Sequence, residues 1–154
     1  MNARRSPLVL AAALLAGCAA VEHVLDIQPR SPLQSVVVLS QVGANADTAT
    51  WLEIVFIYDV KVVEMLPKDA RDWFEHRDAL LNDLSRSIES VRVGMPPASA
   101  YTVPLAPHHA RAVRVFGYAF YPGSDRARRV LDLTTYSCVL LRLEPEDVSR
   151  LPCT

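Results

Sequence analysis

The sequence predicts a mainly β domain, a two-sheet β-sandwich with one inserted amphipathic helix, behind an N-terminal signal sequence. Six or seven short segments rich in β-branched and aromatic residues are separated by turn residues, as in a sandwich. Only one later segment, near residues 69–84, carries apolar residues at helical spacing. Arg4 and Arg5 followed by an apolar run from Pro7 are typical of a secretory signal.

The composition fits one domain once the signal is set aside. Without residues 1–17 the chain has 137 residues, a usual size for a single domain. This removal takes Arg4 and Arg5 from the 16 basic residues and none of the 17 acidic ones, which leaves a formal charge of −3. A net negative charge gives no sign of a basic surface that would attract nucleic acid, so we expect no nucleic-acid partner.

The strands are expected in segments with alternating or continuous apolar residues between turn signals. These segments are 35–40, 51–61, 88–93, 101–105, 112–121, 130–133 and 138–143. Apolar residues lie on both faces of 51–61, so both faces should be covered, and Glu53 and Asp59 are interpreted as strand-face charges. Pro104 confines 101–105 to a sheet edge. Residues 122–125 should turn 112–121 back onto 130–133.

The helix is predicted between Pro67, which breaks the preceding segment, and residue 84. Asp69 is a suitable N-cap for it. Arg77 and its charged neighbours should face water. The apolar stripe that should pack on a sheet consists of Trp73, Phe74, Leu80, Leu81 and Leu84.

The end of the signal resembles a bacterial lipobox, formed by Leu15, Ala16, Gly17 and Cys18. The resemblance implies cleavage between Gly17 and Cys18, a diacylglyceryl group on the Cys18 sulfur and acylation of the freed amine. A plain signal peptide cleaved elsewhere is the main alternative. A membrane-spanning helix fits less well, because Glu22 ends the apolar run short of the roughly 20 residues that a span needs.

The lipobox divides the chain into three parts. Residues 1–17 are the lipoprotein signal peptide, 18–34 the lipidated N-terminus and tether, and 35–154 the sandwich domain. Since Ala19 and not aspartate follows the cysteine, the resemblance to Gram-negative lipoproteins implies an outer-membrane anchor with the domain in the periplasm.

If Cys18 carries lipid, the other two of the three cysteines are left to pair with each other. In an oxidising compartment we expect a disulfide between Cys138 and Cys153, which would pin the C-terminal tail to the strand at 138–143. Two free thiols are the alternative.

No catalytic motif is found in the sequence. It contains no G-x-S-x-G turn, no glycine-rich phosphate loop and no C-x-x-C or H-E-x-x-H spacing. His108 and His109 are adjacent in a turn and make a poor metal site. Glu53 and Asp59 could act as a general acid and base only if they were buried close together. We therefore expect neither an enzyme, nor a metal site, nor a cofactor.

With the elements in this order, the mature chain resembles TssJ, the outer-membrane lipoprotein family of the bacterial type VI secretion system. The family's strand pattern V-x-I-Y-x-L-K corresponds to residues 55–61 here, and its aromatic helix residues to Trp73 and Phe74. Residues 93–96 and 115–121 match the later strands. The tryptophan expected after them is replaced by Arg128 and Arg129, and the tail with Cys138 and Cys153 is not part of the pattern.

The resemblance implies a transthyretin-like sandwich with an extra helix and a structural, non-enzymatic role. The family ties the periplasmic part of the inner-membrane protein TssM to the outer membrane. Its contact is the loop between the first two strands, which here spans about 42–50 and includes Gly43, Asn45, Asp47 and Thr48.

Another kind of envelope lipoprotein is the alternative function. It would bind a small ligand or a protein with a face around Tyr101, Tyr118 and Tyr121.

Overall fold

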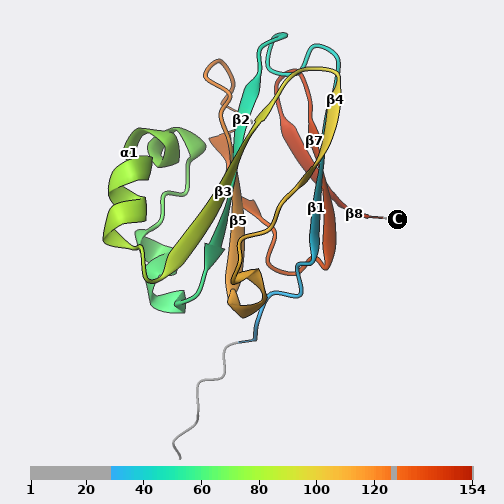
Figure 1. Cartoon of the computed structure of the whole chain (residues 1–154). Helices are drawn as coiled ribbons and strands as arrows, with labels where there is room; N and C mark the ends of the chain where they lie inside the picture. The colour runs from blue at the N-terminus through green and yellow to red at the C-terminus, as the bar shows by residue number, and fades with distance from the viewer. Residues whose placement is uncertain (1–28, 126–127, 154) are drawn as a thin grey trace, which may run out of the picture.

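The computed structural model describes residues 29–125 and 128–153, which form two four-stranded sheets packed face to face and one α-helix (Figure 1). The signal peptide, Leu15, Ala16, Gly17, Cys18 and most of the tether lie outside the described residues. The predicted fold class, a β-sandwich with one inserted helix, is confirmed.

The first sheet, called the β1 sheet, has the strand order β4-β1-β7-β8. Its strands are β1 (Ser35–Ser40), β4 (Ser99–Val103), β7 (Cys138–Leu143) and β8 (Val148–Pro152). Strand β1 pairs antiparallel with β4 and parallel with β7. The predicted edge position of the Pro104 segment is confirmed, because β4 ends this sheet.

The second sheet, called the β2 sheet, is antiparallel and has the order β3-β2-β5-β6. Its strands are β2 (Thr50–Ile57), β3 (Ile88–Met95), β5 (Arg114–Ala119) and β6 (Leu131–Asp132). The predicted return of the chain from β5 onto the 130–133 segment is confirmed by the β5–β6 pairing.

Two apolar clusters hold the layers together. Between the sheets lie alternate residues of the strands, among them Val38, Ile54 and Leu141, all without exposed surface. On the outer face of the β2 sheet lies α1 (Ala70–Asp83), whose Trp73 packs with Val55 and Ile57. Both faces of β2 are therefore covered, as predicted, because the sandwich core takes one face and α1 takes the other.

The predicted strand 51–61 is too long. It ends at Ile57, and a 3-10 helix, η1 (Val60–Met65), follows. Asp59 caps η1, since its Oδ1 accepts the Lys61 N–H at 2.9 Å. A side chain that bonds the backbone two residues further on favours a turn over a strand, which explains the error.

A last strand, β8, was not predicted. Its sequence, Val148-Ser149-Arg150-Leu151-Pro152, is short and contains a proline, which argues against a strand in the middle of a sheet. Pro152 lies opposite Val139 and has no N–H to donate to a neighbouring strand. This is tolerated because β8 is an edge strand.

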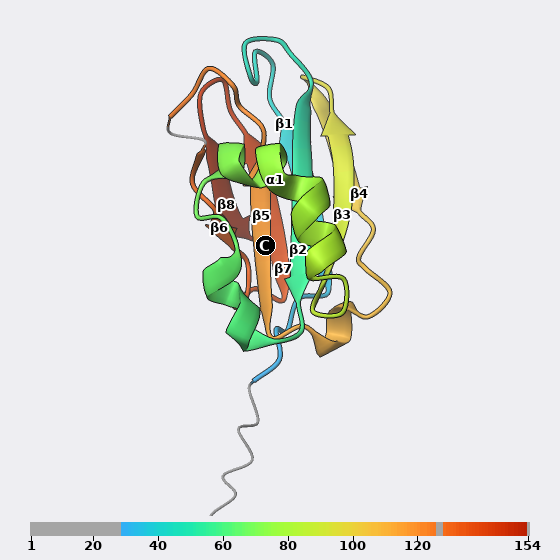
Figure 2. The same cartoon turned by 90° about the vertical axis from the view of Figure 1, so that its left-hand side faces the viewer.

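The sandwich has two distinct ends, which we call the entry end and the loop end (Figures 1 and 2). The entry end holds residues 29–34, the start of η1, and η2 (His109–Arg111). The loop end holds residues 41–49, 120–125 and 144–147. Among the residues described, no helix is both long and apolar enough to cross a membrane.

Candidate functional site

The β1–β2 loop, residues 41–49, covers most of the predicted partner-binding segment and stands at the loop end of the sandwich (Figure 1). Gly43 has a φ of 77°, and Asn45, Ala46 and Asp47 have φ values of 49°, 51° and 58°. Three successive non-glycine residues in the left-handed region are unusual, because each conformation costs about 1 kcal/mol or more. The surrounding contacts must therefore hold this loop in one shape.

Hydrogen bonds fasten the loop to itself and to two neighbouring segments. Within the loop, the Gly43 N–H donates to Asp47 Oδ1 at 3.1 Å. The Asn45 N–H donates to the Glu144 carbonyl at 3.4 Å, and Asn45 Nδ2 donates to the Phe120 carbonyl at 3.5 Å. Asn45 thus joins the loop to the segments after β5 and β7.

The four predicted site residues have different surroundings. Asp47 and Thr48 are exposed, Gly43 is half-buried, and Asn45 is only 8% exposed, so its amide holds the loop in place. Val42, which was not singled out, is 79% exposed, more than any other large apolar residue of the described chain. A single exposed apolar side chain is common on protein surfaces, so Val42 matters here only because it lies on the same fixed loop.

A cleft of about 520 Å³ is lined by residues of the β1–β2 loop and of the segments 120–125 and 144–147. Its acidic lining residues are Asp125 and Glu146. Tyr121 forms part of the floor, and its hydroxyl donates to the Glu144 carbonyl at 2.9 Å. Burial raises the pKa of Tyr121 to about 12, so this phenol stays protonated and keeps donating at physiological pH.

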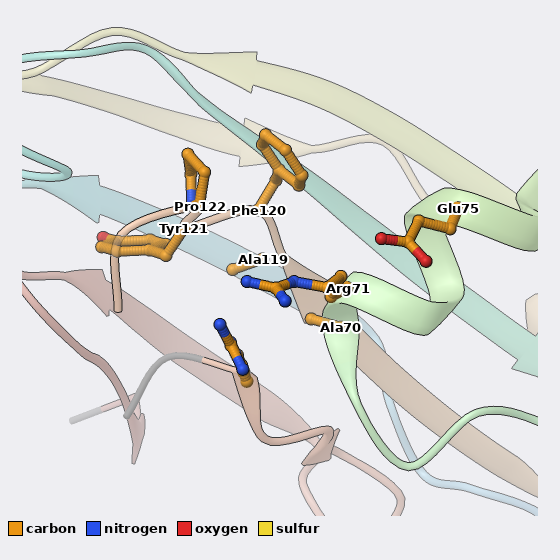
Figure 3. A pocket seen from close by; sticks show the side chains of 8 residues that line it. Ala70, Arg71, Glu75, Ala119, Phe120, Tyr121 and Pro122 are labelled. Atoms are coloured by element: carbon orange, nitrogen blue, oxygen red, sulfur yellow. The ribbon is translucent and has the colours of Figure 1, made fainter. Parts of the chain in front are cut away.

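A smaller pocket of about 120 Å³ lies between the first turn of α1 and the end of β5 (Figure 3). Arg71 points across it, past Ala119 toward Tyr121, and Arg128 lines it too. Arg128 is paired with Asp125 at 3.0 Å. These residues line a small surface hollow beside the loop end.

The interpretation of Asp59 as a strand-face charge is wrong, because β2 ends at Ile57, whereas Glu53 does lie on a face of β2. Its side chain is fully buried under α1 and accepts hydrogen bonds from Ser90 Oγ at 2.6 Å and Trp73 Nε1 at 3.2 Å. Arg77 Nε lies 2.7 Å from Glu53 Oε2, so the prediction that Arg77 faces water is wrong too. The pairing of Glu53 with Arg77 could have been predicted from the sequence. A carboxylate on a strand face that a helix covers needs a cationic partner, and Arg77 lies one turn beyond Trp73 in that helix.

These contacts tie Glu53 to α1 and β3. All the groups around it donate to it and fix the helix on the sheet. Asp59 caps η1, beyond the end of β2. The two acids are held apart in structural roles and do not share a site.

The remaining candidate residues are scattered. His108 Nδ1 lies 2.6 Å from Glu89 Oε1, while His109 Nδ1 lies 2.9 Å from the Ala106 carbonyl oxygen. No group of three metal-binding side chains occurs in residues 29–125 and 128–153.

The three tyrosines do not form one face. Tyr118 is buried under α1, Tyr121 is 4% exposed in the sandwich core, and Tyr101 is 49% exposed on β4. The proposed ligand-binding face is therefore absent from the described residues.

Cys138 and Cys153 are joined by a disulfide, with an Sγ–Sγ distance of 2.01 Å and a Cα–Cα distance of 5.4 Å. The Cys153 N–H also donates to the Cys138 carbonyl at 3.3 Å. The bridge therefore closes the end of the β7–β8 pair.

Several solved structures share this fold. TssJ1, a type VI secretion lipoprotein from Pseudomonas aeruginosa, aligns over 82% of this chain and 98% of its own with a TM-score of 0.55 and 14% identity. Lip from Serratia marcescens, a membrane-bound component of the type VI secretion system, aligns over 82% and 99% with a TM-score of 0.56 and 13% identity.

A third match is a chain in a structure described as the C-terminal domain of the type VI secretion protein TssM from EAEC. It covers 76% of this chain and 98% of the other, with a TM-score of 0.55 and 14% identity. No protein-family model and no curated protein matches the sequence. At these identities the likeness establishes the fold: the chain has the fold of the TssJ lipoproteins, as the sequence pattern had predicted.

Proposed function

We propose that this chain is a non-enzymatic scaffold lipoprotein of a type VI secretion membrane complex. It is anchored in the outer membrane through lipid on Cys18, its domain lies in the periplasm, and it binds the periplasmic part of a TssM-type protein. The β1–β2 loop makes the contact, with Asp47, Thr48 and Val42 on the surface and Asn45 holding the loop in shape.

The observation that carries this proposal is the arrangement of the two ends. The chain enters the sandwich at the entry end, and the fixed, exposed loop stands at the opposite end (Figures 1 and 2). A tether attached to a membrane would therefore leave the loop pointing away from that membrane. Matches that cover nearly the whole of two type VI lipoproteins support the same role.

The loop geometry also favours a binding role. A loop that is already held in one conformation loses little entropy when a partner docks on it. Residues 45–47 have left-handed backbone conformations, and hydrogen bonds join the loop to Phe120 and Glu144, so the loop is ordered before any partner binds.

The anchor can be tested by labelling cells that express the full chain with radioactive palmitate. We expect label on the wild-type protein, a mature mass that begins at Cys18, and loss of label in Cys18→Ser. A mature protein that starts elsewhere and carries no lipid would contradict the anchor.

The partner can be tested by a pull-down of the domain that follows Cys18 against the periplasmic part of TssM from the same bacterium. We expect retention at micromolar concentration. The matched variants Asp47→Arg, in the loop, and Asp83→Arg, at the end of α1, place the same charge change on two exposed sites. Binding should weaken only with Asp47→Arg, and no binding of the wild type would contradict the proposal.

A further inference from the structure

Trp51 lies on the outer face of the β2 sheet, at the edge of the β1–β2 loop, and 47% of its surface is exposed. It shares this face with Glu53, but α1 covers Glu53 and leaves Trp51 uncovered. The chain has only two tryptophans, and the other, Trp73, is fully buried. Tryptophan is among the side chains that are most enriched at the energetic centres of interfaces.

Neighbouring residues hold the Trp51 indole flat against the sheet. Gly94 lies opposite Trp51 in the β2–β3 pairing, and a Cβ at Gly94 would stand 3.1 Å from Trp51 Cζ3. The Arg92 guanidinium carbon lies 4.4 Å from the centre of the indole and 5.6 Å from the centre of the Phe74 ring. This cation–π stacking orders both side chains before any partner binds.

The backbone of Trp51 is hydrogen-bonded to Phe120, which in turn bonds the β1–β2 loop. The Phe120 N–H donates to the Trp51 carbonyl at 2.8 Å, and the Phe120 carbonyl accepts from Asn45 Nδ2. The ring of Phe120 packs edge-on against Phe74 with 5.4 Å between ring centres. Trp51 and the loop therefore belong to one rigid surface.

We propose that Trp51, Arg92 and Gly94 form a second contact site for the same protein partner, beside the β1–β2 loop. This inference rests on the proposed function and extends it to the outer face of the β2 sheet. The site takes an apolar side chain of the partner against the part of the indole that Arg92 and Gly94 leave exposed, next to a carboxylate that pairs with Arg92. The charge requirement follows because Arg92 is exposed and forms no ion pair with any described residue.

The site can be tested on the full lipidated chain in detergent, with its two tryptophans replaced by 5-fluorotryptophan. The probe is the unlabelled periplasmic part of TssM. We expect the Trp51 fluorine signal to shift on binding and to lose its difference between H₂O and D₂O, while the buried Trp73 signal stays in place.

Affinity measurements on variants complete the test. We expect Trp51→Ala to weaken binding about 30-fold, as for a central interface tryptophan. Gly94→Ala keeps the indole but displaces it, so a smaller loss is expected. Leu151→Ala, which truncates a side chain 39% exposed on the β1 sheet, is the matched control and should leave affinity unchanged. Thermal unfolding of each variant shows whether it is folded.

The outcomes separate this inference from the proposed function. If the probe binds wild type and Asp47→Arg weakens it, but the Trp51 signal and the affinity of Trp51→Ala stay the same, the second site is wrong and the loop contact stands. If the probe does not bind the wild type at all, the proposed function fails, and the second site fails with it.

Discussion

At the scale of single residues, Glu53 shows how a buried charge organises this fold. An ionised carboxylate in an apolar layer is costly unless donors surround it. Trp73, Arg77 and Ser90 supply these donors from α1 and β3. The indole of Trp73 also stacks on Tyr118, with ring centres 4.7 Å apart. Glu53 therefore fixes both the position and the rotation of α1 on the sheet.

The change Glu53→Gln tests this role. The amide keeps a single acceptor oxygen for the Trp73 and Arg77 groups, which can only donate, and it removes the charge that Arg77 pairs with. We therefore expect the free energy of unfolding to fall by about 3 kcal/mol. Glu64→Gln, which breaks an exposed pair with Lys68, is the control and should leave stability unchanged. Urea unfolding followed by circular dichroism measures both, and equal stabilities for the two variants would refute the structural role of Glu53.

Glu89 should make stability depend on pH in the acidic range. Burial alone would raise the pKa of Glu89, but hydrogen bonds from Tyr58 and His108 outweigh it and hold this pKa below 4.5. The folded state therefore gains stability from ionised Glu89 above the unfolded pKa, and loses it as the pH falls through the folded pKa.

We expect the free energy of unfolding to drop as the pH falls below about 4.5, and to drop less steeply in Glu89→Gln. Urea unfolding at a series of pH values measures both slopes. Parallel curves for the two proteins would show that Glu89 has no part in the acid response.

At the scale of elements, the alternation of apolar residues in strands and their helical spacing in α1 predicted most of the fold. The segment 35–40 is the strand it was predicted to be, and α1 begins after the predicted N-cap Asp69, whose Oδ1 accepts the Arg71 N–H at 2.7 Å. The errors lie where local hydrogen bonds or tertiary pairing decide the structure. Asp59 ends β2 early, and β8 exists only because β7 offers an open edge.

Only part of the candidate site could be predicted from the sequence. The loop itself came from the family pattern, and Gly43, Asn45 and Asp47 are residue types that tolerate left-handed conformations. Ala46 gives no such sign, although it has a φ of 51°. The contribution of Trp51 could not be predicted either, because its exposure depends on where α1 stops covering the sheet.

The disulfide should stabilise the β7–β8 pair. It joins positions 15 residues apart, for which the chain-entropy model gives about 3 kcal/mol. We expect the double change Cys138→Ser and Cys153→Ser to lower the free energy of unfolding by roughly that amount. Mass spectrometry of unreduced digests checks the bridge itself: separate peptides for the two cysteines would contradict it.

At the scale of the whole molecule, the sandwich places the entry end and the loop end on opposite sides of the domain. Residues 29–34 are held at the entry end, where the Ser31 N–H donates to the Ala112 carbonyl at 2.7 Å and Ser31 Oγ donates to the Thr134 carbonyl at 2.8 Å. Strands β1 and β2 run between this end and the loop end (Figure 1). In the proposed function a pull applied at one end is transmitted through the paired strands to the other.

Site-specific crosslinking in living cells tests this arrangement most directly. The photoreactive residue p-benzoylphenylalanine replaces either Val42 at the loop end or Ala110 in η2 at the entry end, both exposed in the free protein. We expect an adduct with the TssM-type protein from position 42 and none from position 110. Adducts from position 110 and none from position 42 would contradict a scaffold that holds its partner at the end opposite its anchor.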